Sequence, residues 1–261
     1  MTDSPVLADQ EDELVILTLN APARRNAIST QMRSALRDAV RTALKNDSCR
    51  AIVLTGAGAA FSSGADVDQM QSGASADLDQ VRMRYSILHD TVKLMCAGPK
   101  PFVAAVEGFA MGAGLSLASA CDVMIVSRTA KLVSGFGKMG LIGDCGLLWT
   151  MPQRVGIAKT KDFLFSGRSL SGAEAFEMGF ADYVVESGEA LTAAKTRART
   201  YATAAPLTVA ETKTLLNGTY SSLEAFLAAE SAMQDRMCQS ADHDEARRAF
   251  AQKRPPRFIG R

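Results

Sequence analysis

Short apolar runs alternate with longer amphipathic segments along the chain as far as Gly188. The short runs are rich in Val, Ile and Leu, which favours strands, and the longer segments carry apolar residues at helical spacing. The expected strands are Leu14–Leu19, Ala51–Thr55, Phe102–Val106, Val123–Val126 and Tyr183–Val185. The clearest expected helices are Gln31–Lys45 and Leu78–Ala97. Strands and helices that alternate in this way predict an α/β fold.

The pattern changes after Gly188, where the strand-like runs stop. Only helical spacing follows, in the segments Glu189–Ala204, Val209–Asn217, Leu223–Met237 and Asp242–Gln252. We therefore expect a core of residues 1–187 and a helical C-terminal subdomain of residues 188–261. Such a subdomain would also suit an oligomer-forming layer.

Residues 108–122 form the most informative segment of the chain. The expected buried strand of residues 101–106 is followed by Gly112, Ala113 and Gly114, which allow another group to approach the backbone, and then by a nearly uncharged helix from Leu115. The first N–H groups of a helix have no partner within it, so they would face something negatively charged. We expect a turn that holds an anion.

A second glycine-rich turn, Thr55–Asp66, follows an expected strand in the same way. It is no dinucleotide loop, because Phe61 stands where that fingerprint needs a third small residue, and no Gly-Lys-Ser/Thr completes a phosphate-binding loop. Two such turns suit one shared task, which is to direct backbone donors at a single oxygen.

Composition narrows the classes of function. Hydrophobic residues make up 47% of the chain, which excludes a disordered protein. Lys and Arg total 29 against 28 for Asp and Glu, so no net field attracts the chain to nucleic acid or to an anionic membrane. We expect neither as a partner.

The cysteines indicate the compartment. Cys49, Cys96, Cys121, Cys145 and Cys238 are odd in number and scattered, without CxxC pairs, which argues against a disulfide framework and a zinc site. No apolar run approaches the length of a membrane span, and the N-terminus does not look like a signal peptide. These features predict reduced thiols, no bound metal and a cytoplasmic location.

Four motifs carry a family resemblance, and they cover most of the chain. They are PARRNA at Pro22–Ala27, AFSSGAD at Ala60–Asp66, PKPFVAAV at Pro99–Val106 and GAGLSLASACD at Gly112–Asp122. In this order and spacing they resemble the crotonase superfamily, also called the enoyl-CoA hydratase/isomerase family. The later segments Leu164–Gly179 and Ala205–Pro206 resemble that family's subsequent landmarks.

The resemblance implies a spiral of ββα repeats with a C-terminal helical trimerisation subdomain. It also implies an acyl-CoA thioester as substrate, with its carbonyl oxygen between two backbone N–H groups that map to Ala65 and Ala113. Removing a proton beside a thioester forms an enolate, and fixed amide donors stabilise the oxygen that gains the charge. Coenzyme A would enter as part of the substrate, so no separate cofactor is expected.

The resemblance also shows a departure from the hydratases. Hydratases of the family carry glutamates at positions that map to Ser116 and Phe136, and neither residue is a carboxylate base. Ser116 on a helix after such a turn also resembles the related Clp-type protease fold. Without an evident histidine partner, Ser116 is interpreted as a pocket-lining residue and Cys145 as a small core thiol.

Asp144 is the candidate acid/base. Its apolar surroundings should remove water from its carboxyl group and raise its pKa above about 3.9. It aligns with the acid/base residue of certain enoyl-CoA isomerases of the family and with the nucleophile of aroyl-CoA dehalogenases. From the residues alone, the favoured interpretation of Asp144 is the N-cap of the helix that follows it, and the resemblance shifts the preference to a catalytic role.

His89 is a second catalytic candidate, because its spacing to Pro101 matches the histidine base of the aroyl-CoA dehalogenases. A tryptophan beside their nucleophile maps to Phe136 here, however. A histidine in an amphipathic helix is also commonly a packing or surface residue.

Coenzyme A binding is expected at residues on both ends of the chain. Arg24 and Arg25 are expected to bind the phosphates of coenzyme A. They could instead be charged loop residues exposed to solvent. The motif positions that line its path are Ala27, Ala65, Asp66 and Val67. Phe250 and Lys253 resemble the aromatic and the lysine of the family's closing helix, which reach the coenzyme of a neighbouring subunit. That implies a homotrimer or a hexamer of two trimers.

The acyl group is not defined by the sequence. Residues that could line an apolar pocket, or simply belong to the core, are Met70, Met83, Leu88, Phe109, Phe136, Leu141 and Trp149. Three classes of function stay open. They are double-bond isomerisation with Asp144, an activity like that of hydratases, acyl-CoA hydrolases or dehalogenases using Asp144 and His89, and a non-catalytic acyl-CoA- or RNA-binding member.

Overall fold

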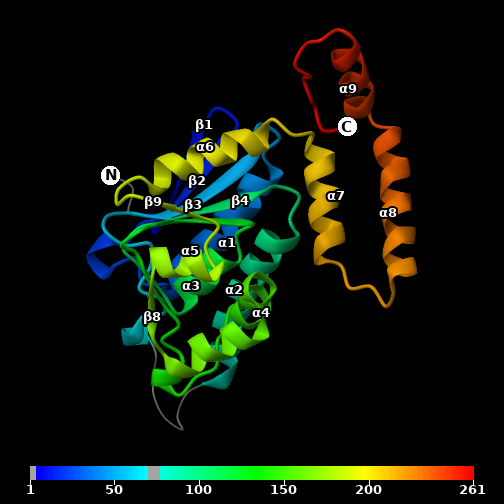
Figure 1. The fold of residues 1–261 in the computed structure, drawn as a ribbon. Coiled ribbons are helices and arrows are strands. Elements are labelled where there is room, and N and C mark those ends of the chain that lie inside the picture. The colour runs from blue at the N-terminus through cyan, green and yellow to red at the C-terminus, as the bar shows by residue number, and fades with distance from the viewer. Residues whose placement is uncertain (1–3, 70–76) are drawn as a thin grey trace.

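A six-stranded sheet runs through the centre of the protein in the computed structural model, which describes residues 4–69 and 77–261 (Figure 1). The strand order is β1-β2-β3-β4-β6-β9, with β1 and β2 antiparallel and every other pair parallel. The strands are β1 (Val6–Glu11), β2 (Leu14–Leu19), β3 (Ala51–Gly56), β4 (Phe102–Val106), β6 (Val123–Ser127) and β9 (Tyr183–Val185). All the strands expected from the sequence are therefore present.

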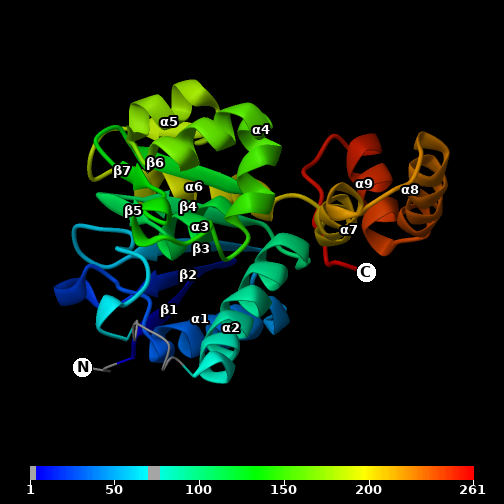
Figure 2. The same ribbon diagram turned by 90° about the horizontal axis from the view of Figure 1, so that it is seen from below.

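Helices cover both faces of this sheet, because successive side chains of a strand point to opposite faces. One face packs against α6 (Ala190–Ala202), whose four buried alanines recur every four residues and let the helix lie close to the strands. The other face buries a larger core against α1 (Thr30–Lys45), α2 (Leu78–Ala97) and α3 (Ala113–Ser119). Figure 2 shows α1 and α2 together on their side of the sheet.

A smaller sheet lies at the ends of the central strands. It pairs β5 (Phe109–Met111) with β7 (Lys131–Val133) and β7 with β8 (Ser169–Ser171). The units β4–β5–α3 and β6–β7–α4 each give one strand to each sheet before their helix, which confirms the expected ββα repeats. Two further helices are α4 (Leu147–Ser166), interrupted at Gly156, and α5 (Gly172–Met178).

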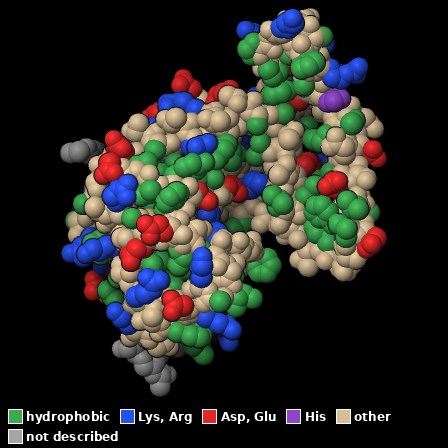
Figure 3. Space-filling view, viewed as in Figure 1, with side chains coloured by type: hydrophobic (Ala, Val, Ile, Leu, Met, Phe, Trp, Pro, Cys, Tyr) green, Lys and Arg blue, Asp and Glu red, His purple; other side chains and the backbone are tan. Residues whose placement is uncertain are grey.

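The C-terminal region differs from the expectation at its first helix. Strands do stop before residue 188, but α6 packs on the central sheet, so the core extends in packing terms to Ala202. The helices that stand beside the core are α7 (Pro206–Asn217), α8 (Leu223–Cys238) and α9 (Ala241–Ala251) (Figure 1). The first two helices, α7 and α8, bury no apolar side chain within this chain, and large apolar residues of α8 lie on its surface (Figure 3).

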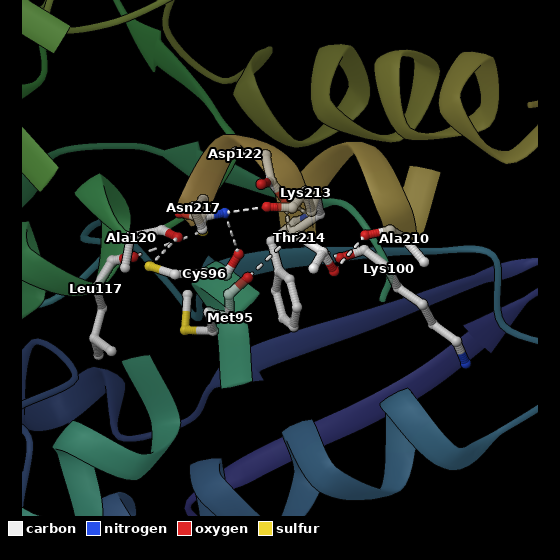
Figure 4. A network of polar contacts seen from close by, with 12 residues as sticks. Met95, Cys96, Lys100, Leu117, Ala120, Asp122, Ala210, Lys213, Thr214 and Asn217 are labelled. Carbon is white, nitrogen blue, oxygen red and sulfur yellow. Dashed lines mark hydrogen bonds and ion pairs between the residues drawn. The ribbon is translucent and has the colours of Figure 1, made fainter. Parts of the chain in front are cut away.

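A polar anchor attaches α7 to the core (Figure 4). The buried ammonium of Lys213 donates to the carbonyls of Met95 and Lys100 at 2.9 and 3.0 Å and to Asp122 Oδ2 at 2.6 Å. It also lies 5.4 Å from the ring centre of Phe102. Because an ammonium has three N–H donors, Lys213 is fully satisfied at this junction.

Two further observations concern the described residues. None of their helices is long and apolar enough to cross a membrane. Within the same residues, no cluster of three or more His, Cys, Asp or Glu side chains is placed to hold a metal ion.

Candidate active site

A cavity of about 680 Å³ opens where the two glycine-rich turns meet. Its walls come from residues 23–28, from residues 63–67 and 111–113 of the two turns, and from residues 134–136. The remaining wall consists of side chains from α1 and α2 and the loop between β7 and α4. More of the wall is apolar than polar, as expected for a small-molecule site.

The two turns interlock through glycines. Gly64 has a φ of 85°, and a Cβ there would lie 2.5 Å from the carbonyl oxygen of Met111 and 3.6 Å from the backbone nitrogen of Ala113. Gly112 has a φ of 50°, a conformation that side chains other than glycine rarely adopt. The positions of both turns are therefore set by backbone contact, which requires glycine at residue 64.

The backbone N–H groups of Ala65 and Ala113 lie on either side of this contact, and both residues line the cavity. Ala113 is the first residue of α3, so its N–H has no acceptor within the helix. Within residues 4–69 and 77–261, neither N–H donates to another group. The structure thus brings together the two donors that the sequence analysis selected.

Asp144 lines the same cavity from the loop before α4. Its Oδ1 is buried and has no hydrogen-bond partner among the residues that the structure describes. Burial raises the pKa of this carboxyl group from its ordinary value of 3.8, against the opposing effects of the Cys145 thiol, Arg33 and His89. The N-cap of α4 is Gly146, without a side-chain cap, so the capping interpretation of Asp144 was wrong.

His89 is placed less favourably for chemistry. It lies on α2, is exposed, stacks on Tyr85 at 6.2 Å between ring centres, and is not part of the cavity wall. Tyr85, one turn earlier, does line the cavity. The catalytic role of His89 stays a prediction that rests on its spacing to Pro101.

Ser116 and Cys145 are both buried, and the hydroxyl of Ser116 donates to the carbonyl of Gly112 at 3.2 Å. Ser116 does not reach the cavity, so its interpretation as a pocket-lining residue was wrong. Burial also raises the pKa of the Cys145 thiol, which keeps it protonated. Neither residue is therefore prepared as a nucleophile.

The expected coenzyme residues outside the C-terminal helices all line the cavity wall: Arg24, Arg25, Ala27, Asp66 and Val67. The guanidinium of Arg24 donates at 2.6 Å to the buried carboxylate of Asp66 and at 2.6 Å to Asp68. Arg24 is thus held by two carboxylates, whereas the exposed side chain of Arg25 makes no such ion pair among the described residues.

Phe250 and Lys253 lie elsewhere, at the end of α9 and directly after it. Both are exposed, with Phe250 at 88%, and neither lines the cavity of its own chain. Figure 1 shows α9 well apart from the turns. A single chain therefore does not bring these two residues to the site.

Sequence reasoning missed three ionisable side chains of the cavity wall, among other residues, and included several residues that do not line it. The three side chains are Arg33 from the first turn of α1 and Arg84 and Tyr85 from α2. Of the expected apolar residues, Phe136 and Leu141 line the cavity, and Met70 lies outside the described residues. The others, Met83, Leu88, Phe109 and Trp149, do not line it. A polar position on a helix carries no local signal that separates a cavity from solvent.

The chain is similar to known proteins in both sequence and structure. Residues 9–261 match a family model described as "Enoyl-CoA hydratase/isomerase". The chain is 33% identical over 260 residues to the 1,2-epoxyphenylacetyl-CoA isomerase of Escherichia coli K12, with 98% of each chain covered. It is 34% identical over 249 residues to a probable enoyl-CoA hydratase of Rhodobacter capsulatus, with 95% of each covered. The crystal structure of an enoyl-CoA hydratase from Polaromonas sp. JS666 superimposes with a TM-score of 0.91 at 31% identity, covering 97% of this chain and 99% of that one.

Proposed function

Because the chain belongs to the enoyl-CoA hydratase/isomerase family, we propose that it moves the double bond of an enoyl-CoA, with Asp144 as acid and base. The observation that carries this proposal is the desolvated carboxylate of Asp144, which lines the same cavity as the free N–H groups of Ala65 and Ala113. Coenzyme A enters with the substrate, the enzyme acts in the cytoplasm, and no further cofactor takes part.

In the proposed reaction the thioester oxygen accepts hydrogen bonds from Ala65 and Ala113. Asp144 removes a proton from a carbon next to the double bond, and the electron pair moves onto the thioester oxygen as an enolate. The two N–H groups form an oxyanion hole for this charge. Asp144 then returns its proton to a different carbon, so the product has the same atoms as the substrate with its double bond shifted.

The raised pKa of Asp144 suits this task. A group that first accepts a proton and then donates it works best when its pKa is close to the operating pH. Hydration would need a carboxylate to activate water as well. The residues at the positions expected for that purpose are Ser116, which donates to a backbone carbonyl, and Phe136, an apolar wall. The contacts of the described residues therefore support isomerisation over hydration.

Hydration remains the alternative, and the names of several relatives favour it. Hydrolysis or dehalogenation with His89 receives less support, because His89 is not in the cavity wall. A non-catalytic acyl-CoA- or RNA-binding role is the alternative without chemistry. Each alternative predicts a different outcome with an acyl-CoA. Hydration adds one water, hydrolysis releases free coenzyme A, dehalogenation releases a halide, and a non-catalytic protein leaves the acyl-CoA unchanged.

The test is incubation with a panel of 2-enoyl- and 3-enoyl-CoAs, including aromatic acyl groups, with each product identified by mass and double-bond position. We expect products of unchanged mass with a shifted double bond. Asp144→Asn should lower kcat by about a hundred- to ten-thousandfold. Asp162→Asn, an exposed aspartate on α4, is the matched control and should leave kcat unchanged. Full turnover by Asp144→Asn would exclude the proposed role.

We further propose a homotrimer or a hexamer of two trimers, in which α9 of one subunit contributes Phe250 and Lys253 to the coenzyme site of its neighbour. The exposed apolar residues of the C-terminal helices support this, since α8 buries no side chain in its own chain. Sedimentation should give the mass of a trimer or hexamer, and Phe250→Ala should weaken acyl-CoA binding. An active monomer would contradict both statements.

A further inference from the structure

Arg33 is a cation in the cavity wall for which the proposed reaction has no use. It lies in the first turn of α1, and its Nε and Nη1 donate to the backbone carbonyls of Ile28 and Arg84 at 3.4 and 3.2 Å. A guanidinium has five N–H donors, so these two bonds leave most of them available. Among the described residues, no carboxylate lies within 4.0 Å of it.

Desolvation of the Arg33 guanidinium costs free energy unless a ligand supplies the missing hydrogen-bond acceptors. The side chain is largely withdrawn from water, and desolvation lowers the pKa of Arg33 from its ordinary value. A charge taken from water is normally paired, because the lost hydration must be replaced by a counter-ion or by hydrogen bonds. Two weak bonds to carbonyls replace only part of it.

Arg33 lies in the part of the cavity that surrounds Asp144. The ionisable groups close enough to affect it are Asp144 and Cys145 from the loop and Arg84 and Tyr85 from α2. Arg24, by contrast, is paired with Asp66 and Asp68 at the end where coenzyme A is expected. The cavity wall therefore holds Arg24, which is paired with two carboxylates, and Arg33, which makes no ion pair with a described residue.

The cavity wall also has apolar side chains, among them Phe136, Met139 and Leu141. An acyl chain that starts at the N–H groups of Ala65 and Ala113 would pass Asp144 along this wall. A purely hydrocarbon acyl group would fill the space and leave the guanidinium of Arg33 desolvated without a partner. An oxygen acceptor beyond the reacting carbons would accept from it, and a carboxylate would do so with matching fork geometry and opposite charge.

We propose that the acyl group of the substrate carries a hydrogen-bond-accepting oxygen beyond its reacting carbons, with a carboxylate bound most tightly, and that Arg33 binds this oxygen. The statement rests on the proposed function only in taking the cavity as the acyl-CoA site. It names the substrate class and makes Arg33 a specificity-determining residue.

The experiment measures binding rather than turnover, so that it does not depend on the reaction. Isothermal titration of the full-length protein at one salt concentration gives Kd for succinyl-, glutaryl- and adipoyl-CoA. Each is compared with the acyl-CoA of equal length whose terminal carboxylate is replaced by an isopropyl group of similar shape. We expect the carboxylate to bind about tenfold or more tightly than its partner for at least one length.

Substitutions at Arg33 test whether this residue causes the preference for the carboxylate compound. Arg33→Met should abolish or reverse the ratio of the two Kd values, and Arg33→Lys should keep part of it, since it retains the charge without the fork. The ratio is taken on one protein sample, so a loss of folded protein cancels. Arg25→Met, which removes an exposed arginine of the same cavity wall, is the matched control and should change both Kd values equally.

Two results would overturn the proposal, and they differ in what else they exclude. Tighter binding of the isopropyl compound at every length, or an unchanged ratio in Arg33→Met, would exclude the role of Arg33 and leave acyl-CoA chemistry intact. A wild-type protein that binds neither series would exclude the acyl-CoA site itself, and the proposed function with it.

Discussion

The junction beneath α7 and the cavity each withdraw charged side chains from water, but they treat them differently. At the junction, all three donors of Lys213 have partners and Asp122 Oδ2 also accepts from the backbone N–H of Phe102 at 2.7 Å. In the cavity, Asp144 Oδ1 has no partner among the described residues and Arg33 has only backbone carbonyls. Satisfied charges hold two parts of the fold together, whereas unsatisfied ones are available to a ligand.

The same contrast appears in the apolar residues. The core around the sheet buries its large side chains almost completely, among them Phe61, Phe102 and Phe163. The helices beyond Ala202 leave Leu216, Leu223 and Leu227 exposed. The core around the sheet is thus complete within one chain, while the C-terminal helices leave large apolar side chains on the surface.

Apart from loss of Asp144 itself, the largest effect is expected from a substitution at Gly64, where the two turns of the cavity are in backbone contact. Gly64→Ala would place a Cβ 2.5 Å from the carbonyl oxygen of Met111, so the turn must move and carry the N–H of Ala65 with it. We expect kcat to fall about a hundred- to a thousandfold, the usual loss for one oxyanion donor. Gly179→Ala is the control, because it has a φ of 84° but no atom within 4 Å of the new Cβ. Equal losses in both variants would show that the strain of positive φ alone is responsible.

The next effect is on stability and concerns the junction. Lys213→Met removes the ammonium and leaves Asp122 and two carbonyls without their donor. Breaking a fully buried pair costs about 3–5 kcal/mol, and we expect about 2–3 kcal/mol here because the Asp122 side chain is 28% exposed. Chemical denaturation measures this. Arg33→Met removes a cation without a counter-ion and should cost much less, so similar losses in the two variants would remove the distinction between the regions.

Sequence reasoning recovered elements whose signal is local. The strands β2, β4 and β9 and the helix α2 have the predicted bounds because each is a continuous apolar or amphipathic run. The strand β1 was missed because Asp9, Gln10 and Glu11 give an edge strand a polar pattern, and its register comes from antiparallel pairing with β2. The hydrophobic periodicity of a segment can be recognised from that segment alone, whereas its pairing partner in a sheet depends on a second segment.

The residues of the candidate site also differ in whether their signal is local in the sequence. Ala65, Ala113 and Asp144 were predicted because they belong to motifs or to a segment with one carboxylate, and the structure places all three in one cavity. Arg33 was missed because its environment is made by α2 and the loop before α4, far away in the sequence. Phe250 and Lys253 do not reach the cavity of their own chain, so their predicted role depends on a neighbouring subunit.

A smaller effect concerns the pH dependence of the reaction. Asp144 must be ionised to accept a proton, so kcat/KM should fall as pH drops through its pKa, which burial raises above 3.8. The groups that face Asp144 are Arg33 from α1, His89 from α2 and the adjacent Cys145. Because the Arg33 cation lowers the pKa of Asp144, Arg33→Met should move the acid limb of the profile to higher pH. A limb that stays in place or moves down would show that the two groups do not interact.

The smallest effect tests whether the unpartnered Asp144 costs stability. A carboxyl group whose pKa is raised on folding contributes stability that is fully present below its unfolded pKa and is lost as pH rises through its folded pKa. Above the folded pKa that contribution is gone, and the ionised group is kept from water without a partner for Oδ1 among the described residues. Asp144→Asn removes the charge with little change in shape, so at pH 7 the variant should unfold at the same temperature as the wild type or slightly above it. The difference should shrink as the pH falls through the raised pKa of Asp144, because the wild-type carboxyl group then becomes protonated in the folded state. A lower unfolding temperature for Asp144→Asn at pH 7 would show that the Asp144 carboxylate stabilises the fold, and would contradict the prediction that this unpartnered group costs stability.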